Sequence, residues 1–210
     1  MISLNAALAF FGASVLLALA PGPDNVFVLL QSAMRGRAAG LRVVLGLCTG
    51  LLGHTAAVAG GLAALFAASA TAFVIVKWAG ALYLAWLAWQ AFRAPAGEIA
   101  STTAESGPGD GWAMYRRGVI MNLTNPKVAL FFLAFLPQFA DPARGPIWAQ
   151  IVLLGAIFML ATLLVFGAIA WFAASLGGWL RHSPRAHLAL NRAAGAVFAL
   201  LALRLALAER

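Results

Sequence analysis

Long apolar runs separated by short polar stretches extend along almost the whole chain. A helix needs about 20 apolar residues to cross a bilayer. We therefore predict six membrane-spanning helices, over residues 4–34, 43–66, 70–92, 118–139, 147–176 and 188–208. Between the third and fourth runs the chain is rich in Gly, Pro, Ser and Thr, which is typical of an exposed connection. The pattern predicts an all-α integral membrane protein with helical units at 1–93 and 118–210 and a polar cytoplasmic linker at 94–117.

The two predicted units resemble each other. The segments KWAGALYLAWLAW from Lys77 and RAAGAVFALLALR from Arg192 each begin with a basic residue, followed by Ala-Gly-Ala and an aromatic residue. The first helix of each unit is interrupted by proline, at Pro23 and at Pro126. Three helices per unit make the second unit an inverted copy of the first, an architecture of secondary transporters. Chance similarity between two apolar sequences is the alternative.

Composition supports the membrane assignment. The chain is 63% hydrophobic and 10% charged, with a mean hydropathy of +0.93, whereas about a quarter of the residues are charged in soluble domains. The net charge is +8, but the basic residues sit at the ends of apolar runs, so we expect no nucleic-acid partner. With the N-terminus outside, the loops placed inside would hold most of the arginines, which favours both termini outside: Arg35, Arg37, Arg42, Arg93, Arg116, Arg117, Arg181, Arg185 and Arg192.

The first apolar run is broken in the stretch ALAPGPDNVFVLL, residues 18–30. Pro21 and Pro23 interrupt helical hydrogen bonding, and in lipid the freed backbone groups must find other partners. We expect Gly22 to cap a second half-helix that starts at Pro23 and carries Asp24 in its first turn. An acid there is stabilised by the helix dipole, so capping alone is one interpretation of Asp24.

The fourth run is broken in a similar way within NLTNPKVALFF. We expect Asn125 as the N-cap, Pro126 as the first helical residue and Lys127 as the second. Asp24 and Lys127 then lie at the same structural position, each about 15 Å from a basic flank at roughly 1.5 Å per residue, near the middle of the bilayer. A lysine in the first turn opposes the helix dipole, so capping does not account for it.

A salt bridge between Asp24 and Lys127 is the structural interpretation of this pair. Against it stands the cost of charges at the bilayer centre, about 3 kcal/mol each, because such residues usually mark transport pathways. We therefore expect Asp24 to bind a cation, a proton or both. The neighbouring amides Asn25, Asn122 and Asn125 either contact the ligand or complete the open backbone groups at the breaks.

Small residues follow one face of the second predicted helix, including Gly46, Gly50 and Gly53. Such a stripe lets another helix approach closely. We favour tight packing within one bundle over a homodimer face.

Other function classes have weaker support. The sequence has no nucleotide-binding or hydrolase motif, so we expect no cofactor and no enzyme; only Asp24 with His54 offers an acid and base pair. One deep acid without a Cys/His cluster makes a poor divalent metal site. The alternatives that stay open are a cation exporter and a non-transporting scaffold, and the scaffold predicts that exchanging the charges of Asp24 and Lys127 is tolerated.

Taken together, Pro21-Gly22-Pro23, KWAGALYLAWLAW and NLTNPKVALFFLAFLPQF resemble the lysine-exporter family of the LysE/RhtB type over essentially the whole chain. One departure is Ala88, where glycine is frequent. The resemblance implies a bacterial inner-membrane exporter of amino acids or related metabolites, driven by the proton motive force. Members carry basic amino acids, threonine and homoserine, or neutral and sulfur-containing ones. By position, the family's motifs fall on residues 21–24 and 125–127.

The resemblance leads to a mechanistic hypothesis. The ammonium group of a zwitterionic amino acid would engage Asp24 and its carboxylate Lys127, before one repeat rocks against the other. Protonation of Asp24 outside would release the substrate. The lack of a second deep acid points to neutral rather than basic amino acids.

Overall fold

The computed structural model describes residues 2–20, 22–62, 70–93 and 111–182, and from there on the residues 188, 189, 192, 195, 196, 199, 200, 202, 203 and 205–207. Pro21, residues 94–110 of the linker and much of the predicted helix at 188–208 lie outside the described residues. Every regular element in the described part is helical. This confirms the all-α prediction.

The elements follow one another with few irregular residues between them. In chain order they are α1 (Leu4–Leu19), α2 (Pro23–Arg35), α3 (Arg37–Ala57), the π-helix η1 (Val58–Leu62), α5 (Ala70–Arg93), α6 (Gly111–Thr124), α7 (Pro126–Leu130), the π-helix η2 (Phe131–Phe135), the 3₁₀ turns η3 (Leu136–Phe139) and η4 (Pro142–Arg144), and α8 (Ile147–His182).

Helix α6 begins earlier than predicted. It starts at Gly111, so residues 111–117 of the predicted linker are helical. The arginines Arg116 and Arg117 suggested a flank outside the helix, but Met114, on the same turn, is buried. Trp112 also stacks on Tyr115 with ring centroids 5.2 Å apart. An apolar face with charged neighbours is compatible with a helix that enters the membrane at an angle.

Two described helices are long and apolar enough to cross a membrane, at Arg37–Gly61 and Ile147–Ala173. Two bent pairs also qualify if each is one span: α1 with α2 at 63°, and Gly111–Thr124 with Pro126–Phe139 at 50°. The described residues thus contain two to four candidate spans. The predicted count of six stays a prediction.

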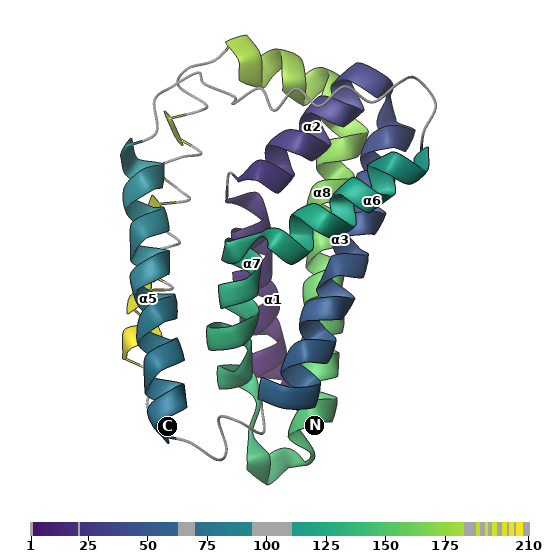
Figure 1. Cartoon of the computed structure of the whole chain (residues 1–210). Coiled ribbons are helices and arrows are strands. Elements are labelled where there is room, and N and C mark those ends of the chain that lie inside the picture. The colour runs from purple at the N-terminus through teal and green to yellow at the C-terminus, as the bar shows by residue number, and fades with distance from the viewer. Residues whose placement is uncertain are drawn as a thin grey trace.

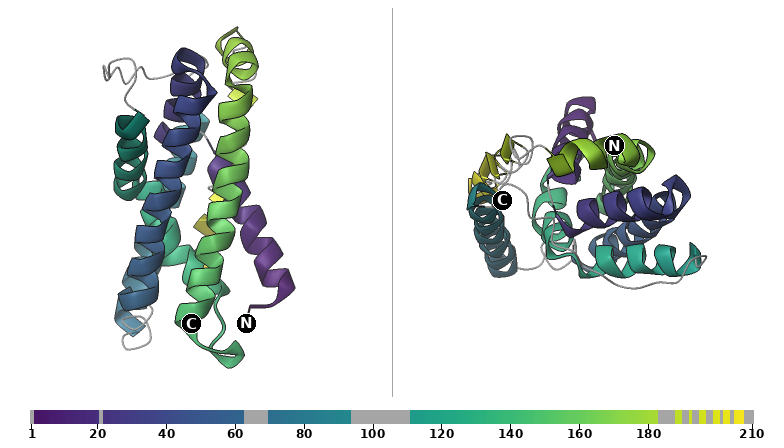
Figure 2. Two further views of the ribbon diagram at one scale, coloured as in Figure 1. Left: turned by 90° about the vertical axis from the view of Figure 1, so that its right-hand side faces the viewer. Right: turned by 90° about the horizontal axis from the view of Figure 1, so that it is seen from above.

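The long helices α3 and α8 run side by side along the length of the molecule (Figures 1 and 2). Helix α6 packs on α3, whereas α1 and α2 pack against α8, and α5 lies to one side in contact with η2 (Figure 1). The marked ends of the chain lie at the same end of the molecule, and the junction of α2 with α3 lies at the other (Figure 2). Large apolar side chains such as Leu45, Leu82 and Leu164 are exposed on the outside, as a lipid-facing surface requires.

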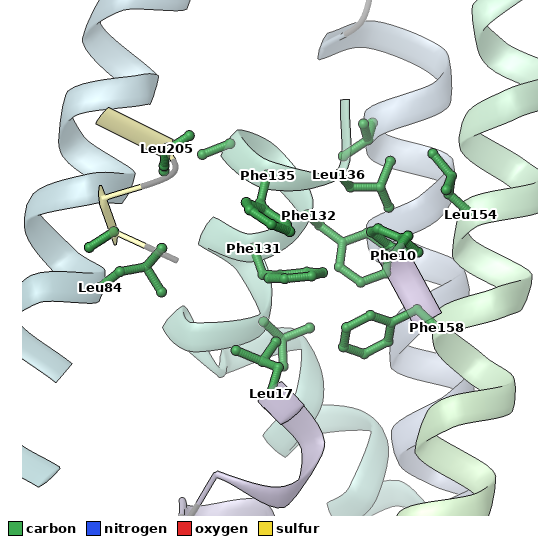
Figure 3. Packing of buried hydrophobic residues seen from close by; sticks show 14 of the residues in the cluster. Phe10, Leu17, Leu84, Phe131, Phe132, Phe135, Leu136, Leu154, Phe158 and Leu205 are labelled. Carbon is green, nitrogen blue, oxygen red and sulfur yellow. The ribbon is translucent and has the colours of Figure 1, made fainter. Parts of the chain in front are cut away.

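Five phenylalanines from α1, η2, η3 and α8 form a continuous set of tilted and edge-on ring contacts inside the bundle, here called the aromatic cluster: Phe10, Phe131, Phe135, Phe139 and Phe158. Adjacent ring centroids are 4.9 Å apart for Phe131 and Phe135 and 5.3 Å apart for Phe131 and Phe158. Figure 3 shows four of these side chains, Phe10, Phe131, Phe135 and Phe158, packed close together. A cluster of this kind combines large apolar burial with favourable ring geometry.

The glycine stripe of α3 lies against α6 in the same chain. A methyl group added to Gly46 would overlap the carbonyl of Tyr115, and one added to Gly118 would overlap the carbonyl of Val43. Gly50 faces the side chain of Asn122, whose Oδ1 lies 2.7 Å from the position that a Cβ would take. The two backbones therefore approach as closely as glycine alone permits, and this contact fixes the position of Asn122.

Candidate functional site

The two helix breaks occur where the sequence predicts them. Helix α2 starts at Pro23 with Gly22 as its N-cap, and Asp24 lies in its first turn. Helix α7 starts at Pro126, and the Oδ1 atom of its N-cap Asn125 accepts a hydrogen bond from the backbone N–H of Lys127 at 3.0 Å. Both breaks thus expose helix N-termini, whose partial positive charge favours anions.

Asp24 is buried with 3% of its surface exposed. Its Oδ2 atom accepts a hydrogen bond from Nδ2 of Asn125 at 2.8 Å. Its Oδ1 atom is buried and has no hydrogen-bond partner within the described chain. Because a buried carboxylate oxygen is costly to leave unpaired, Asp24 is positioned to accept one more hydrogen bond.

The salt bridge that is the structural interpretation of Asp24 and Lys127 is not seen among the described residues. In the described part of the chain Lys127 forms no direct ion pair with Asp24, although the two charges attract each other at longer range. Its Nζ atom instead donates to the carbonyls of Leu17 at 3.3 Å and Ala20 at 3.2 Å. Lys127 therefore caps the carbonyl end of α1, a different helix from its own, where a cation is favourable. Sequence reasoning considered the helix of Lys127, a salt bridge to Asp24 and a ligand carboxylate, but not the end of α1.

The other two predicted amides, Asn25 and Asn122, make different contacts. Nδ2 of Asn25 donates to the carbonyl of Ala18 at 2.7 Å, so Asn25 completes an open backbone group of α1. The backbone carbonyl of Asn122 accepts from the N–H of Asn125 at 3.1 Å and lies 3.1 Å from Nε2 of His54. Its side-chain Oδ1 atom is buried without a partner among the described residues. The Oδ1 atom of Asn122 is therefore available to accept a hydrogen bond.

Asp24, Asn122 and Lys127 line one small cavity, here called the central cavity. Its volume is ≈ 10 Å³, which is room for about one water molecule. Its other lining residues are also buried: Leu17, Ala18, Leu47, Val128, Phe158, Thr162 and Phe166. An amino acid does not fit into this space, so its entry requires the walls to move apart.

Helix α8 contributes three cavity residues that sequence reasoning missed. Phe158, Thr162 and Phe166 are spaced four residues apart and therefore share one helix face. The signal was present in the sequence, since Gln150 and Thr162 are the only hydroxyl or amide side chains in Ile147–Ala173. A hydroxyl group inside a membrane span is costly, so a threonine there is a candidate for a specific contact.

A second, larger pocket opens near the N-terminus and is here called the vestibule. It has a volume of ≈ 640 Å³, and its polar wall includes Asn5, Gln138 and the ion pair of Asp141 with Arg144 at 3.2 Å. Phe135 and Phe139 also line it, whereas Phe158 lines the central cavity. The aromatic cluster therefore lies between the vestibule and the central cavity.

Metal binding has no support at these sites. Within the ranges that the structure describes, no group of three or more His, Cys, Asp or Glu side chains is placed to hold an ion.

Comparison with known proteins adds an independent line of evidence. Residues 15–209 match the family described as LysE type translocator. The chain is 37% identical, over 96% of each chain, to the homoserine/homoserine lactone efflux protein of Salmonella typhimurium. It is 37% identical, over 91% of each chain, to an uncharacterized membrane protein of Vibrio cholerae. A cysteine/O-acetylserine efflux protein of Salmonella choleraesuis is 28% identical over 78% of each chain. No solved structure matches the chain.

Proposed function

The chain belongs to the LysE type translocator family, and we propose that this membrane protein exports small amino acids or closely related metabolites from the cytoplasm. The observation that carries the proposal is the central cavity, where a buried carboxylate and a buried ammonium group lie at two helix breaks. These charges are complementary to those of a zwitterion. The two efflux relatives described above are named for homoserine, its lactone, cysteine and O-acetylserine.

The charge balance of the cavity favours neutral amino acids. Asp24 is the acid among the lining residues and Lys127 the base, so one ammonium and one carboxylate group of a ligand would find partners. A basic side chain would need a second acid. The compounds named for the relatives are small and polar, which suits a cavity whose polar groups belong to Asn122 and Thr162 as well as to the two charged residues.

We propose alternating access for the transport cycle. The two bent pairs, α1 with α2 and α6 with the segment from α7 to η3, would be the broken first helices of two inverted three-helix repeats. Rocking of one repeat against the other would open the central cavity first to the cytoplasm and then, past the aromatic cluster, to the vestibule. The π-helix η2 carries part of this cluster, and such irregular turns are frequent at functional sites.

The distribution of charge supports an orientation of the protein in the membrane. The junction of α2 with α3 and the start of α6 carry Arg35, Arg37, Arg116 and Arg117, at the end of the molecule opposite the N-terminus (Figure 1). By the positive-inside rule that end would face the cytoplasm, at the inner membrane. The vestibule and both termini would then lie outside. Protons entering from outside would protonate Asp24, release the ammonium group of the substrate and return to the cytoplasm.

Efflux from cells loaded with dipeptides tests the proposal. Cells that express the wild-type protein should release one group of amino acids faster than cells with the empty vector, with homoserine measured first. Asp24→Asn, at equal amounts in the membrane, should lose this release. Asp141→Asn, which removes a carboxylate outside the central cavity, should keep most of it. Unchanged release of every amino acid by the wild type would refute amino-acid export.

A further inference from the structure

Three residues that line the central cavity each carry a buried oxygen atom without a hydrogen-bond partner in the described chain. These atoms are Oδ1 of Asp24, Oδ1 of Asn122 and Oγ1 of Thr162. Each of the three residues is at most 3% exposed. They come from α2, α6 and α8, three elements far apart in sequence. A buried polar atom without a partner costs free energy, so three such residues around one cavity are suited to accept hydrogen bonds from a ligand group.

Thr162 differs from five other helical hydroxyl residues in the described part of the chain. These five hydroxyls donate to the carbonyl four residues earlier, which is the ordinary solution inside a helix: Ser14, Ser32, Thr49, Thr55 and Thr124. The Thr162 hydroxyl makes no such bond to Phe158 or to any other described residue. It lines the cavity instead, where a valine would fill the same volume without the cost.

We infer that Thr162 is a ligand-binding residue and that it completes, with Asp24 and Asn122, a three-oxygen site for the ammonium group of the substrate. The inference rests on the proposed function and extends it to a residue on α8. An ammonium group has three N–H donors, and a carboxylate oxygen, an amide oxygen and a hydroxyl oxygen each accept one. Its positive charge balances Asp24. Lys127 is held at the carbonyl end of α1. The ligand carboxylate would point toward Lys127, on the side of the ligand opposite its ammonium group.

The site also accounts for the spacing on α8. Phe158 and Phe166 lie one helical turn on either side of Thr162 and line the same cavity. When the cavity widens, these rings would bound the space for the rest of the ligand while the hydroxyl stays directed at the ammonium group. The two aromatic residues would then limit the size of ligand that can bind. The three oxygens would recognise its amine.

Binding to purified protein in detergent tests the inference. Thr162→Val removes the hydroxyl at constant volume, and Thr162→Ser keeps it. With L-homoserine as the probe, Thr162→Val should raise Kd about tenfold, which corresponds to about 1.4 kcal/mol, whereas Thr162→Ser should stay within about threefold. 4-Hydroxybutanoate, which lacks the amine, should bind weakly and equally to all three proteins. An unchanged Kd for Thr162→Val, or an equal effect on both probes, would overturn the inference.

A second readout separates ligand binding from a structural role. Without ligand, Thr162→Val should unfold at the same temperature as the wild type or higher, because it removes an unpaired hydroxyl. The matched control is Thr55→Val. Thr55 is also buried, but its hydroxyl donates to Leu51, so its loss should lower the unfolding temperature and leave the Kd unchanged. A lower unfolding temperature for ligand-free Thr162→Val would show a structural role and contradict the inference.

Small cations distinguish failure of the inference from failure of the proposed function. If the wild type neither exports nor binds any amino acid, the proposed function fails. Thermal stabilisation by methylammonium that Thr162→Val abolishes would still support the amine site. Stabilisation by sodium relative to choline, without any effect of amines, would assign the three oxygens to an inorganic cation and overturn the inference, as would the absence of any stabilisation.

Discussion

The Nδ2 atom of Asn125 donates a hydrogen bond to Oδ2 of Asp24 at 2.8 Å across 101 positions of sequence. The same side chain uses its Oδ1 atom to cap α7. One amide thus joins the break of the first bent pair to the break of the second. Because both amide atoms are used, the orientation of Asn125 is fixed, and so is the oxygen of Asp24 that faces the cavity.

Two substitutions of Asn125 separate its roles. Asn125→Ser keeps an N-cap but does not reach Asp24, so we expect clearly reduced efflux and a loss of thermal stability of about 1–3 kcal/mol from the unpaired carboxylate oxygen. Asn125→Ala loses the cap as well, at about 0.5–2 kcal/mol, and should unfold at a lower temperature than the serine variant. Thermal unfolding in detergent and efflux in cells measure the two effects. Wild-type efflux by Asn125→Ser would show that the bond to Asp24 is dispensable.

Lys127→Met should destabilise the protein strongly. The change leaves the carbonyls of Leu17 and Ala20 without their donor and leaves Asp24 without a buried counter-charge. Removing one member of a buried charge pair costs about 3–5 kcal/mol. We expect a low yield of monodisperse protein on size-exclusion chromatography. The double variant with Asp24→Asn should recover part of this yield without recovering efflux.

Exchanging the two charges tests these contacts further. Asp24→Lys with Lys127→Asp keeps the net charge, but it places a carboxylate beside the carbonyls that close α1. We expect the exchange to fold poorly. A stable exchanged protein would mean that only the mutual attraction of the two charges matters, as a simple scaffold predicts.

The crossing of α3 and α6 allows no side chain at its centre. Gly118→Ala places a methyl group against the backbone at Val43, so it should lower stability by about 1–3 kcal/mol through overpacking. Gly167→Ala is the matched control, because nothing lies within 4 Å of its added methyl group. The control should be neutral or slightly stabilising. Equal unfolding temperatures for the two variants would contradict the close contact seen at the crossing.

Thiol labelling tests the orientation in the membrane. The protein has a single cysteine, Cys48, which is buried, so Cys48→Ala provides the background. Ala6→Cys, in the wall of the vestibule, should react with a membrane-impermeant maleimide added to cells whose outer membrane is permeable. Met34→Cys, 73% exposed at the other end of α2, should react only after the inner membrane is opened. The reverse pattern would place the vestibule in the cytoplasm.

Sequence reasoning located the helix breaks because proline and glycine act locally. The capping roles of Gly22 and Asn125 depend on nearest neighbours, and both agree with the structure. Sequence reasoning failed where a residue's contact partner lies in a distant part of the chain. Lys127 caps α1, a contact that the sequence reasoning did not consider, and Thr162 reaches the cavity from α8. Such contacts follow from how the helices pack, which hydrophobic periodicity in a uniformly apolar span does not specify.

The aromatic cluster has a consequence for the energy supply of the cell. Any path through a membrane protein is also a route by which ions run down the membrane potential. A continuous set of rings from Phe158 at the central cavity to Phe135 and Phe139 at the vestibule offers an ion no oxygen to replace its hydration shell. If the proposed path is correct, the phenylalanines would form an apolar barrier to ions, and a solute that carries its own balanced charges would be better suited to cross this region than a bare ion.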